Sequence, residues 1–177
     1  MEIQFTDTSE RGFQKYITNY LVNEHKYTET SYVEFNREFC LNTKQLMNFI
    51  EITQPGTFEM IQRKGERSFL VRLDDKIKEL GVIEVLRKGV KHFDKTVELF
   101  YRKPSSAYNV KDAARYNANN FSVTQELHYS LSHENRLDLT IFVNGIPVIT
   151  TELKNPLSGQ TVQNGIRQYL NDRDPKE

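Results

Sequence analysis

The clearest periodic pattern of the chain lies between residues 136 and 154. Apolar side chains alternate there with other residues, which is the period-2 pattern of a β-strand. The apolar positions are Leu137, Leu139, Ile141 and Val143, and Asp138, Thr140 and Phe142 lie between them. Asn144-Gly145 then interrupts the run, as hairpin turns do. Because β-branched residues resume after Pro147, the segment is predicted to form a β-hairpin.

The length of the hairpin loop decides which charges share a face. A two-residue loop would place Glu152 and Lys154 on the face of the leucines, where burying two charges is costly. A three-residue loop centred on Gly145 instead places Asp138 opposite Glu152 and separates apolar from charged side chains. Gly145 supplies the left-handed conformation that such a loop needs. We therefore predict the three-residue loop.

The rest of the chain divides into a helical first part and a sheet-forming second part. Apolar residues at helical spacing predict helices at about 9–24, 42–50, 58–61 and 68–80, a short helix at 110–116 and a closing helix at about 161–171. Alternation predicts further strands at 93–101 and 121–129, and residues 25–35 read as a connection. In the first helix the apolar face is expected to hold Phe13, Tyr16, Ile17, Tyr20 and Leu21.

These elements predict an α/β fold in which helices flank a mixed central β-sheet. We expect one domain over residues 1–177, made of a helical region at about 1–80, a sheet core with the hairpin at about 90–155 and the closing helix. The length of 177 residues leaves room for one substantial core.

Composition narrows the function classes. With 37% apolar and 27% charged residues, the chain has the composition of a soluble globular protein. It has neither a run of about 18 apolar residues nor a signal-peptide pattern at its start, so no membrane association is expected. A single cysteine excludes an internal disulfide and fits a reducing cytoplasm. The net charge of zero argues against a generic basic nucleic-acid binder.

The candidate chemistry lies on the polar face of the hairpin. There Asp138, Glu152 and Lys154 converge, and two carboxylates held together repel unless a cation relieves them. Oxygen ligands with open positions suit Mg²⁺, and a neighbouring lysine can orient or deprotonate a water. This set indicates metal-dependent phosphodiester hydrolysis. From spacing alone, a surface salt bridge on a hairpin is the alternative.

Asp138 followed by Glu152-Leu153-Lys154 resembles the PD-(D/E)xK nuclease core. The surrounding sequence resembles the amino-terminal nuclease domain of the restriction (R) subunit of type I restriction-modification enzymes. The stretches that carry this likeness are Asp-Leu-Thr-Ile-Phe-Val-Asn-Gly-Ile-Pro-Val, Glu-Leu-Lys-Asn-Pro, Ile-Arg-Gln-Tyr-Leu and, upstream, Thr53-Gln54-Pro55, Val85-Leu86-Arg87-Lys88-Gly89 and Tyr116-Asn117-Ala118-Asn119-Asn120-Phe121. The likeness covers most of the chain.

The resemblance implies a role for each residue of the core. Asp138 and Glu152 would bind Mg²⁺, with the backbone carbonyl of Leu153 as a further ligand. Lys154 would serve the attacking water, and the reaction would cleave double-stranded DNA. Many PD-(D/E)xK nucleases add an acidic residue from the first helix. Glu10 is the candidate here, although an acid in a first helical turn also has a purely electrostatic explanation.

Relatives also carry a Gln-x-x-x-Tyr signature on the helix that follows the lysine. Tyr169 matches its tyrosine, whereas the glutamine position is Gly165, a departure from the family pattern. Gln168 or Gln163 could take over that part as near neighbours on the helix.

The resemblance further implies a larger assembly. R subunits join modification (M) and specificity (S) subunits in the cytoplasm of bacteria or archaea, and an ATP-driven translocase follows their nuclease domain. We expect this chain to be the amino-terminal part of such a subunit, so ATP would serve only the absent translocase. The alternatives are a catalytically idle docking domain of the same fold and a nuclease of another PD-(D/E)xK branch, such as a repair or RecB-like enzyme.

Overall fold

The computed structural model describes residues 9–106, 108–155, 159 and 161–172. Its helical elements are α1 (Glu10–His25), the 3₁₀ turn η1 (Tyr32–Glu34), α2 (Thr43–Thr53), α3 (Pro55–Lys64), α4 (Glu66–Leu80), α5 (Val82–Lys88), α6 (Val110–Asn117), α7 (Val162–Arg167) and the π-helical segment η3 (Gln168–Asp172). Its strands are β1 (Thr28–Thr30), β2 (Val90–His92), β3 (Lys95–Val97), β4 (Phe121–His128), β5 (Arg136–Val143) and β6 (Ile146–Thr151). Residues 1–8 of the predicted helical region lie outside the described residues, as do residues 156–158 between the hairpin and the predicted closing helix.

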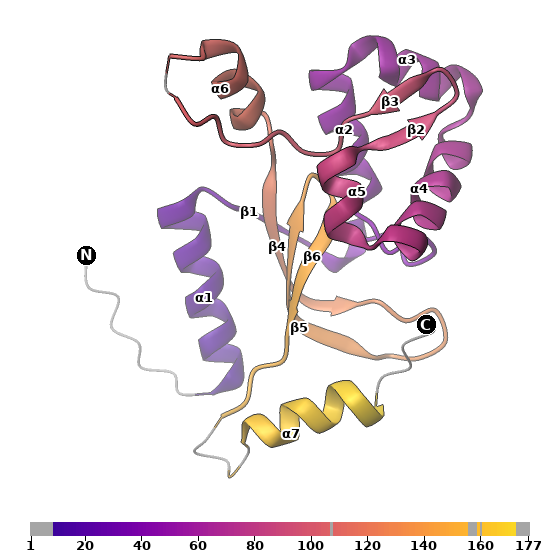
Figure 1. The fold of residues 1–177 in the computed structure, drawn as a ribbon. Coiled ribbons are helices and arrows are strands. Elements are labelled where there is room, and N and C mark those ends of the chain that lie inside the picture. The colour runs from indigo at the N-terminus through magenta and orange to yellow at the C-terminus, as the bar shows by residue number, and fades with distance from the viewer. Residues whose placement is uncertain (1–8, 107, 156–158, 160, 173–177) are drawn as a thin grey trace.

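Four strands form one mixed sheet in the order β1-β4-β5-β6. β1 runs parallel to β4, whereas the β4–β5 and β5–β6 pairs are antiparallel. α1 packs beside this sheet against β4 and β1, and α7 lies beyond the end of β6 (Figure 1). The predicted fold class, α/β with a mixed sheet flanked by helices, is therefore confirmed, and it is compatible with a nuclease-like core.

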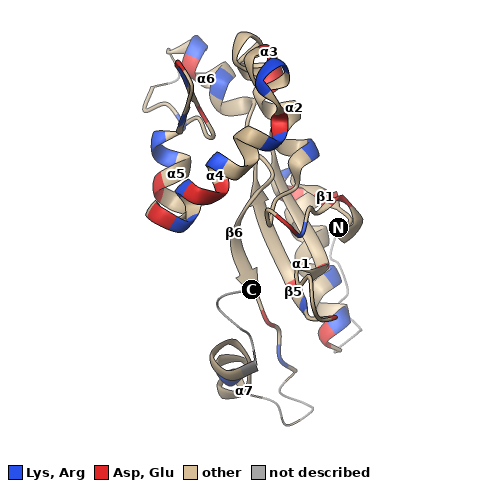
Figure 2. Ribbon diagram, turned by 90° about the vertical axis from the view of Figure 1, so that its right-hand side faces the viewer, with Lys and Arg blue, Asp and Glu red and all other residues tan. Residues whose placement is uncertain are grey.

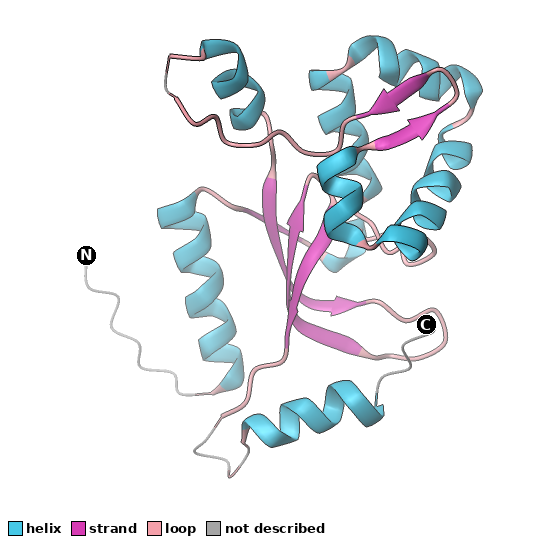
Figure 3. Cartoon of the chain, viewed as in Figure 1, coloured by secondary structure: helices cyan, strands magenta, loops and turns pink. Residues whose placement is uncertain are grey.

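The helices α2–α5 and the β2–β3 hairpin gather at the opposite end of the sheet from α7, and we call this unit the helical lobe (Figure 3). Its buried side chains form one continuous apolar cluster. They include Leu46, Phe49, Ile50, Met60, Ile61, Phe69, Leu70, Leu73, Val85, Val90 and Val97. The Asn42 side chain caps α2 by accepting from the Gln45 amide at 3.1 Å, and Gly81 ends α4 at a positive φ of 80°. These helix ends follow the sequence prediction.

The hairpin turn is shorter than predicted. Val143 pairs with Ile146, so the loop holds the two residues Asn144 and Gly145, both at positive φ (51° and 82°). A register shift between Ile141 and Phe142 then changes the pairing, and Leu139 lies opposite Thr151. The three-residue loop was therefore wrong. The bulge restores the register that such a loop would have given, and Asp138 ends level with Glu152 as predicted.

The face that α1 turns to the sheet also differs from the prediction. The helix has the expected bounds, and the Ser9 side chain caps it by accepting from the Gly12 amide at 3.0 Å. Its buried residues are Gly12, Gln14 and Thr18. Of the predicted apolar residues, Phe13, Tyr16 and Tyr20 are exposed, whereas Ile17 and Leu21 are half-buried. The fully buried side chains of α1 are therefore polar.

Three local predictions need correction or extension. Residues 93–101 are not one strand, because Phe93, at a positive φ of 52°, belongs to the turn between β2 and β3, and β3 ends at Val97. Residues 25–35 are not only a connection, since they contain the edge strand β1, whose parallel pairing with β4 leaves no local sequence pattern. The closing helix exists, but it turns π-helical after Arg167.

Charged residues of both signs are interspersed over the helical lobe (Figure 2). On α5, for example, Arg87 and Lys88 both pair with Glu84, at 3.0 and 2.8 Å. Exposed pairs of this kind contribute little to stability. Within the described part of the chain, no helix is long and apolar enough to cross a membrane.

Candidate active site

The end of the hairpin brings the three predicted catalytic residues together. Asp138 lies on β5, and Glu152 and Lys154 follow directly after β6. The amide of Leu153 donates to Asp138 Oδ2 at 2.6 Å, which fixes the segment after β6 against β5. Lys154 Nζ lies 4.0 Å from Glu152 Oε2, and the two side chains are only 17% and 3% exposed. Leu153 thus meets Asp138 through its amide, and a metal-binding role for its carbonyl stays a prediction.

The first turn of α1 reaches the same place. Glu10 Oε1 accepts from the amide of Asn155 at 3.0 Å, so the helix start contacts the residue that follows Lys154. This contact explains how residue 10 reaches a site formed about 140 positions later in the chain. The structure therefore brings Glu10 to the predicted site, whether or not it binds a metal there.

A polar cavity of about 360 Å³ connects these groups. Its walls come from α1, β4, β5, the segment after β6 and the start of η3. The lining residues are Glu10, Glu126, Glu134, Asn135, Arg136, Asp138, Glu152, Lys154 and Gln168. Of the two glutamines predicted to support the site, Gln168 is therefore in place, whereas Gln163 is exposed and lines neither this cavity nor the neighbouring one.

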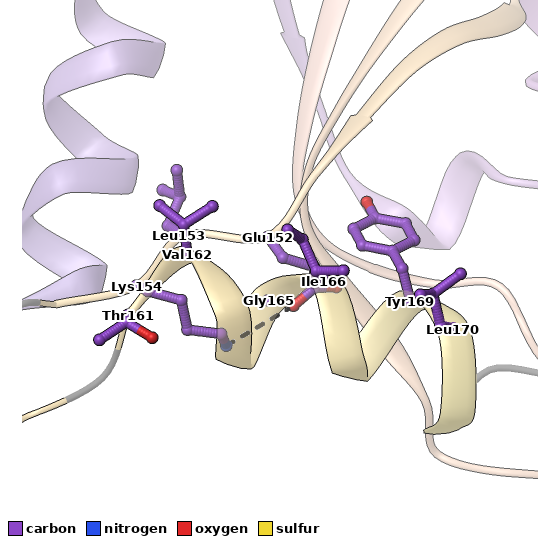
Figure 4. Close-up of a pocket in the computed structure, with 9 residues that line it drawn as sticks. All are labelled: Glu152, Leu153, Lys154, Thr161, Val162, Gly165, Ile166, Tyr169 and Leu170. Atoms are coloured by element: carbon purple, nitrogen blue, oxygen red, sulfur yellow. Dashed lines mark ion pairs between the residues drawn. The ribbon is translucent and has the colours of Figure 1, made fainter.

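α7 packs against the other side of the lysine segment, and a second, mostly apolar cavity of about 750 Å³ lies between them (Figure 4). Tyr169 lines this cavity, and its hydroxyl donates to Thr150 Oγ1 of β6 at 3.0 Å. Gly165 is buried, and a Cβ at that position would lie 3.8 Å from Lys154 Cγ. The residue at the expected glutamine position thus packs directly on the predicted catalytic lysine.

A comparison with known protein families shows which family the chain belongs to. A family model described as type I restriction enzyme R protein N terminus matches residues 10–177. The chain belongs to this family. No curated protein and no solved structure matches it significantly. The match begins at Glu10 and takes in the hairpin and α7, so every predicted site residue of this R protein amino-terminal region falls inside it.

The electrostatics of the site centre on Asp138. Burial raises the pKa of its carboxyl group, and the charges of Glu126 and Glu10 raise it further. The hydrogen bond from the Leu153 amide and the charge of Lys154 act in the opposite direction, and burial outweighs them. The carboxylate form of Asp138 is therefore held at a cost in the absence of a cation.

We tested whether these residues fit the divalent cation that the family resemblance implies. In the described residues no group of three or more histidine, cysteine, aspartate or glutamate side chains is arranged to hold a metal ion. The site is thus no closed metal cage. Its crowded carboxylates and open polar cavity do fit Mg²⁺, which usually takes one or two carboxylates and keeps several waters or phosphate oxygens.

Sequence reasoning missed four residues of the cavity wall, which are Glu126 on β4, Glu134 and Asn135 in the connection to β5, and Arg136 on β5. Glu126 and Arg136 pair with one another at 3.1 Å. Finding Glu126 required the register between β4 and β5, because it lies between the pairs Gln125–Leu139 and Leu127–Leu137 and so falls level with Asp138. The long connection between these strands does not fix that register, so the sequence held no signal for it.

Proposed function

We propose that this chain is a Mg²⁺-dependent endonuclease domain that hydrolyses phosphodiester bonds of double-stranded DNA within a type I restriction enzyme. The observation that carries the proposal is the 2.6 Å contact between Leu153 and Asp138. It brings one carboxylate of β5 beside the Glu152-Lys154 segment at a single open cavity. Family membership supports the reaction class.

Each side chain has a distinct part in this proposal. Asp138 and Glu152 would hold the cation, which when bound supplies charge neutralisation for the phosphate. Glu152 suits this part because its side chain is almost fully buried and cannot swing into solvent. Glu10 would support the site from α1, either as a ligand or through its hold on Asn155.

Lys154 is placed to act on the attacking water. Its aliphatic part packs on Gly165 and its ammonium group faces the carboxylates, so few orientations remain open to it. A lysine held in this way can orient a water and screen charge on the phosphate. Tyr169 and Gln168 would support it from the helix side, Tyr169 by docking α7 on β6.

The wider setting follows from the same proposal. The partners would be double-stranded DNA and the M and S subunits, in the cytoplasm of a bacterium or archaeon. Translocation driven by ATP would come from another part of the R subunit. The neutral net charge fits a nuclease domain that receives DNA from other parts of an assembly.

Calorimetric titration of Mn²⁺ into the chain, with and without a DNA duplex, tests the metal site. We expect binding in the wild type and at least a tenfold weaker affinity in Asp138→Asn, which keeps the shape of the side chain. Glu59→Gln, an exposed carboxylate of the helical lobe, is the matched control and should bind as the wild type does. Absence of binding under both conditions would favour the idle docking domain.

Cleavage of a plasmid tests the lysine separately. Lys154→Ala should leave Mn²⁺ binding intact and slow cleavage by about 10²–10⁴-fold, the usual contribution of a positioned proton-transfer group. Equal cleavage by the variant and the wild type would remove Lys154 from the mechanism. Because the metal arm and the lysine arm use different variants, each part of the proposal can fail alone.

A further inference from the structure

Glu126 holds an unusual backbone conformation in the middle of β4. Its φ is +50°, in the left-handed region that side chains other than glycine rarely adopt, although the residues on either side of it pair regularly with β5. Such a conformation costs energy and persists where the surroundings impose it, often at functional sites. The residue lies level with Asp138 and lines the same cavity.

Both oxygens of the Glu126 carboxylate have partners, and these come from two different elements. Gln14 Nε2 of α1 donates to Oε1 at 2.9 Å, and the Arg136 guanidinium of β5 lies 3.1 Å from Oε2. Gln14 is only 3% exposed, whereas the Glu126 side chain is 39% exposed, so the first contact is shielded from water on the side of α1. Glu126 is therefore the point where α1, β4 and β5 are joined by polar contacts.

The contact with Gln14 also fixes Glu10. These two residues are four apart on α1, so they lie on the same face of the helix. Because the fully buried residues of α1 are Gly12, Gln14 and Thr18, its position depends on polar contacts as well as on its half-buried apolar side chains. The hydrogen bonds Gln14–Glu126 and Glu10–Asn155 thus hold the start of α1 against the lysine segment.

The contact with Arg136 has a second consequence. Arg136 and Asp138 are two apart on β5, so their side chains leave the same face of the strand about 7 Å apart. An arginine at that distance can reach the aspartate and pair with it bidentately. Pairing with Glu126 directs the guanidinium to β4 instead, and the Asp138 carboxylate stays open to the cavity.

We propose that Glu126 is a positioning residue of this site, which anchors α1 through Gln14 and keeps Arg136 from occupying Asp138. The expected effect of Glu126 on metal binding rests on the proposed nuclease function. Its expected effect on the position of α1 does not depend on that function. The two can therefore be tested on separate readouts.

Glu126→Gly is the decisive variant, because glycine accepts a φ of +50° without strain and the fold should persist. Hydrogen exchange followed by mass spectrometry should show at least tenfold faster exchange in the first turns of α1 and at the Asn155 amide. Exchange in the helical lobe, which gathers at the opposite end of the sheet from α7, is the internal reference. Exchange at the wild-type rate in α1 and at Asn155 would overturn the proposal.

Glu126→Gln separates the two contacts. The glutamine oxygen still accepts from Gln14, so slow exchange in α1 should be rescued. The charge that holds Arg136 is gone, so Mn²⁺ affinity should fall about tenfold in both variants. Glu59→Gln, the exposed carboxylate of the helical lobe, is the matched control and should change neither readout.

The outcomes distinguish this inference from the proposed function. If the wild type binds no Mn²⁺ with or without duplex DNA, the nuclease proposal fails, and the exchange experiment still decides whether Glu126 anchors α1. If the wild type binds Mn²⁺ and both variants bind it equally well, Glu126 does not position the metal site and this inference is wrong.

Discussion

The helical lobe and the sheet half, by which we mean α1 and the strands β1 and β4–β6, bury different kinds of side chain. The lobe encloses one apolar cluster that runs from Phe39 to Leu99 and also takes in Ile146 of the hairpin. The sheet half has a much smaller apolar cluster around Leu127, Leu137 and Phe142. Between α1 and the sheet, Gln14 and Thr18 are buried instead.

The two regions therefore have different roles, since one provides stability and the other holds the site. Apolar burial provides most of the free energy of folding, so the lobe can carry stability for the whole chain. The sheet half can then hold buried polar groups and crowded carboxylates, which stabilise a fold poorly but which a site needs. The hairpin turn, packed on the start of α2, links the two regions.

The largest expected effect tests whether the helical lobe provides most of the stability of the chain. Phe69 is fully buried and contacts His92 edge-on, with ring centroids 5.5 Å apart. Phe69→Ala should therefore lower the free energy of unfolding by about 3–5 kcal/mol, measured by urea denaturation. Ile83→Ala, an exposed apolar residue of α5, should stay within about 0.5 kcal/mol of the wild type. Similar losses in the two variants would contradict a stability role for the apolar cluster.

The next largest effect tests the link between the two regions, which is the packing of the hairpin turn on the start of α2. A Cβ on Gly145 would lie 2.3 Å from the Asn42 carbonyl oxygen and 2.8 Å from the Leu46 amide nitrogen, both backbone atoms. Gly81 has a similar φ but open space around it. Gly81→Ala should cost only the backbone strain, about 1–3 kcal/mol. Gly145→Ala should cost about 1–3 kcal/mol more, by thermal denaturation, because the clash adds to the strain. Equal losses would show that the turn does not press on α2.

The same link explains which parts of the hairpin could be predicted. The position of Asp138 beside Glu152 follows from local alternation and from the cost of burying charges, and both are visible in the sequence. The two-residue turn also has a local signal, because Asn-Gly is a common pair in hairpin turns that need two residues at positive φ. The bulge that follows has no such signal. The turn makes a tertiary contact, in which the Asn42 amide donates to the Gly145 carbonyl at 2.8 Å. No local pattern records such a contact.

The sheet half was harder to predict for a related reason. Periodicity assigns the aromatic residues of α1 to its buried face, yet the helix buries Gln14 and Thr18 because it meets a site rather than an apolar core. The sequence does not single out Glu126, because its role depends on strand register and on a left-handed φ. Neither property can be read from the sequence around an ordinary strand residue. The catalytic candidates could be named because the hairpin pattern groups them on one face and the family resemblance gives each a role.

A smaller effect tests the buried polar groups of the sheet half. The Thr18 hydroxyl is buried and has no hydrogen-bond partner in the described part of the chain. Thr18→Val keeps the shape and removes the unsatisfied group, so it should stabilise the fold by about 1 kcal/mol in thermal denaturation. Thr53→Val is the matched control. Its hydroxyl donates to the Phe49 carbonyl at 2.7 Å, and losing that bond should destabilise slightly. Destabilisation by Thr18→Val would show that this interface is better satisfied than its contacts indicate.

The smallest expected effect concerns the stability that the folded chain loses by keeping the Asp138 carboxyl group ionised. The pKa of Asp138 is raised in the folded chain by burial and then by neighbouring carboxylates, against the Leu153 hydrogen bond and Lys154. The folded state therefore binds this proton more tightly than the unfolded state does, and stability is lost as pH rises from the ordinary aspartate pKa through the raised one. Asp138→Asn should remove that loss and raise the melting temperature at pH 7 in EDTA. The gain should be at most about 1 kcal/mol, because the carboxylate is half-exposed and screened.

Two further conditions decide whether that gain comes from the charge. On acidification below the ordinary aspartate pKa, the wild type becomes neutral at this position as well, so the difference between the proteins should disappear. On addition of Mg²⁺ at pH 7, a ligand that binds only the folded wild type should stabilise it and leave Asp138→Asn unchanged. The order of the two melting temperatures would then reverse. A difference that persists at low pH and ignores Mg²⁺ would mean that Asp138 is merely a poorly packed residue, and that the sheet half sacrifices no stability for metal binding.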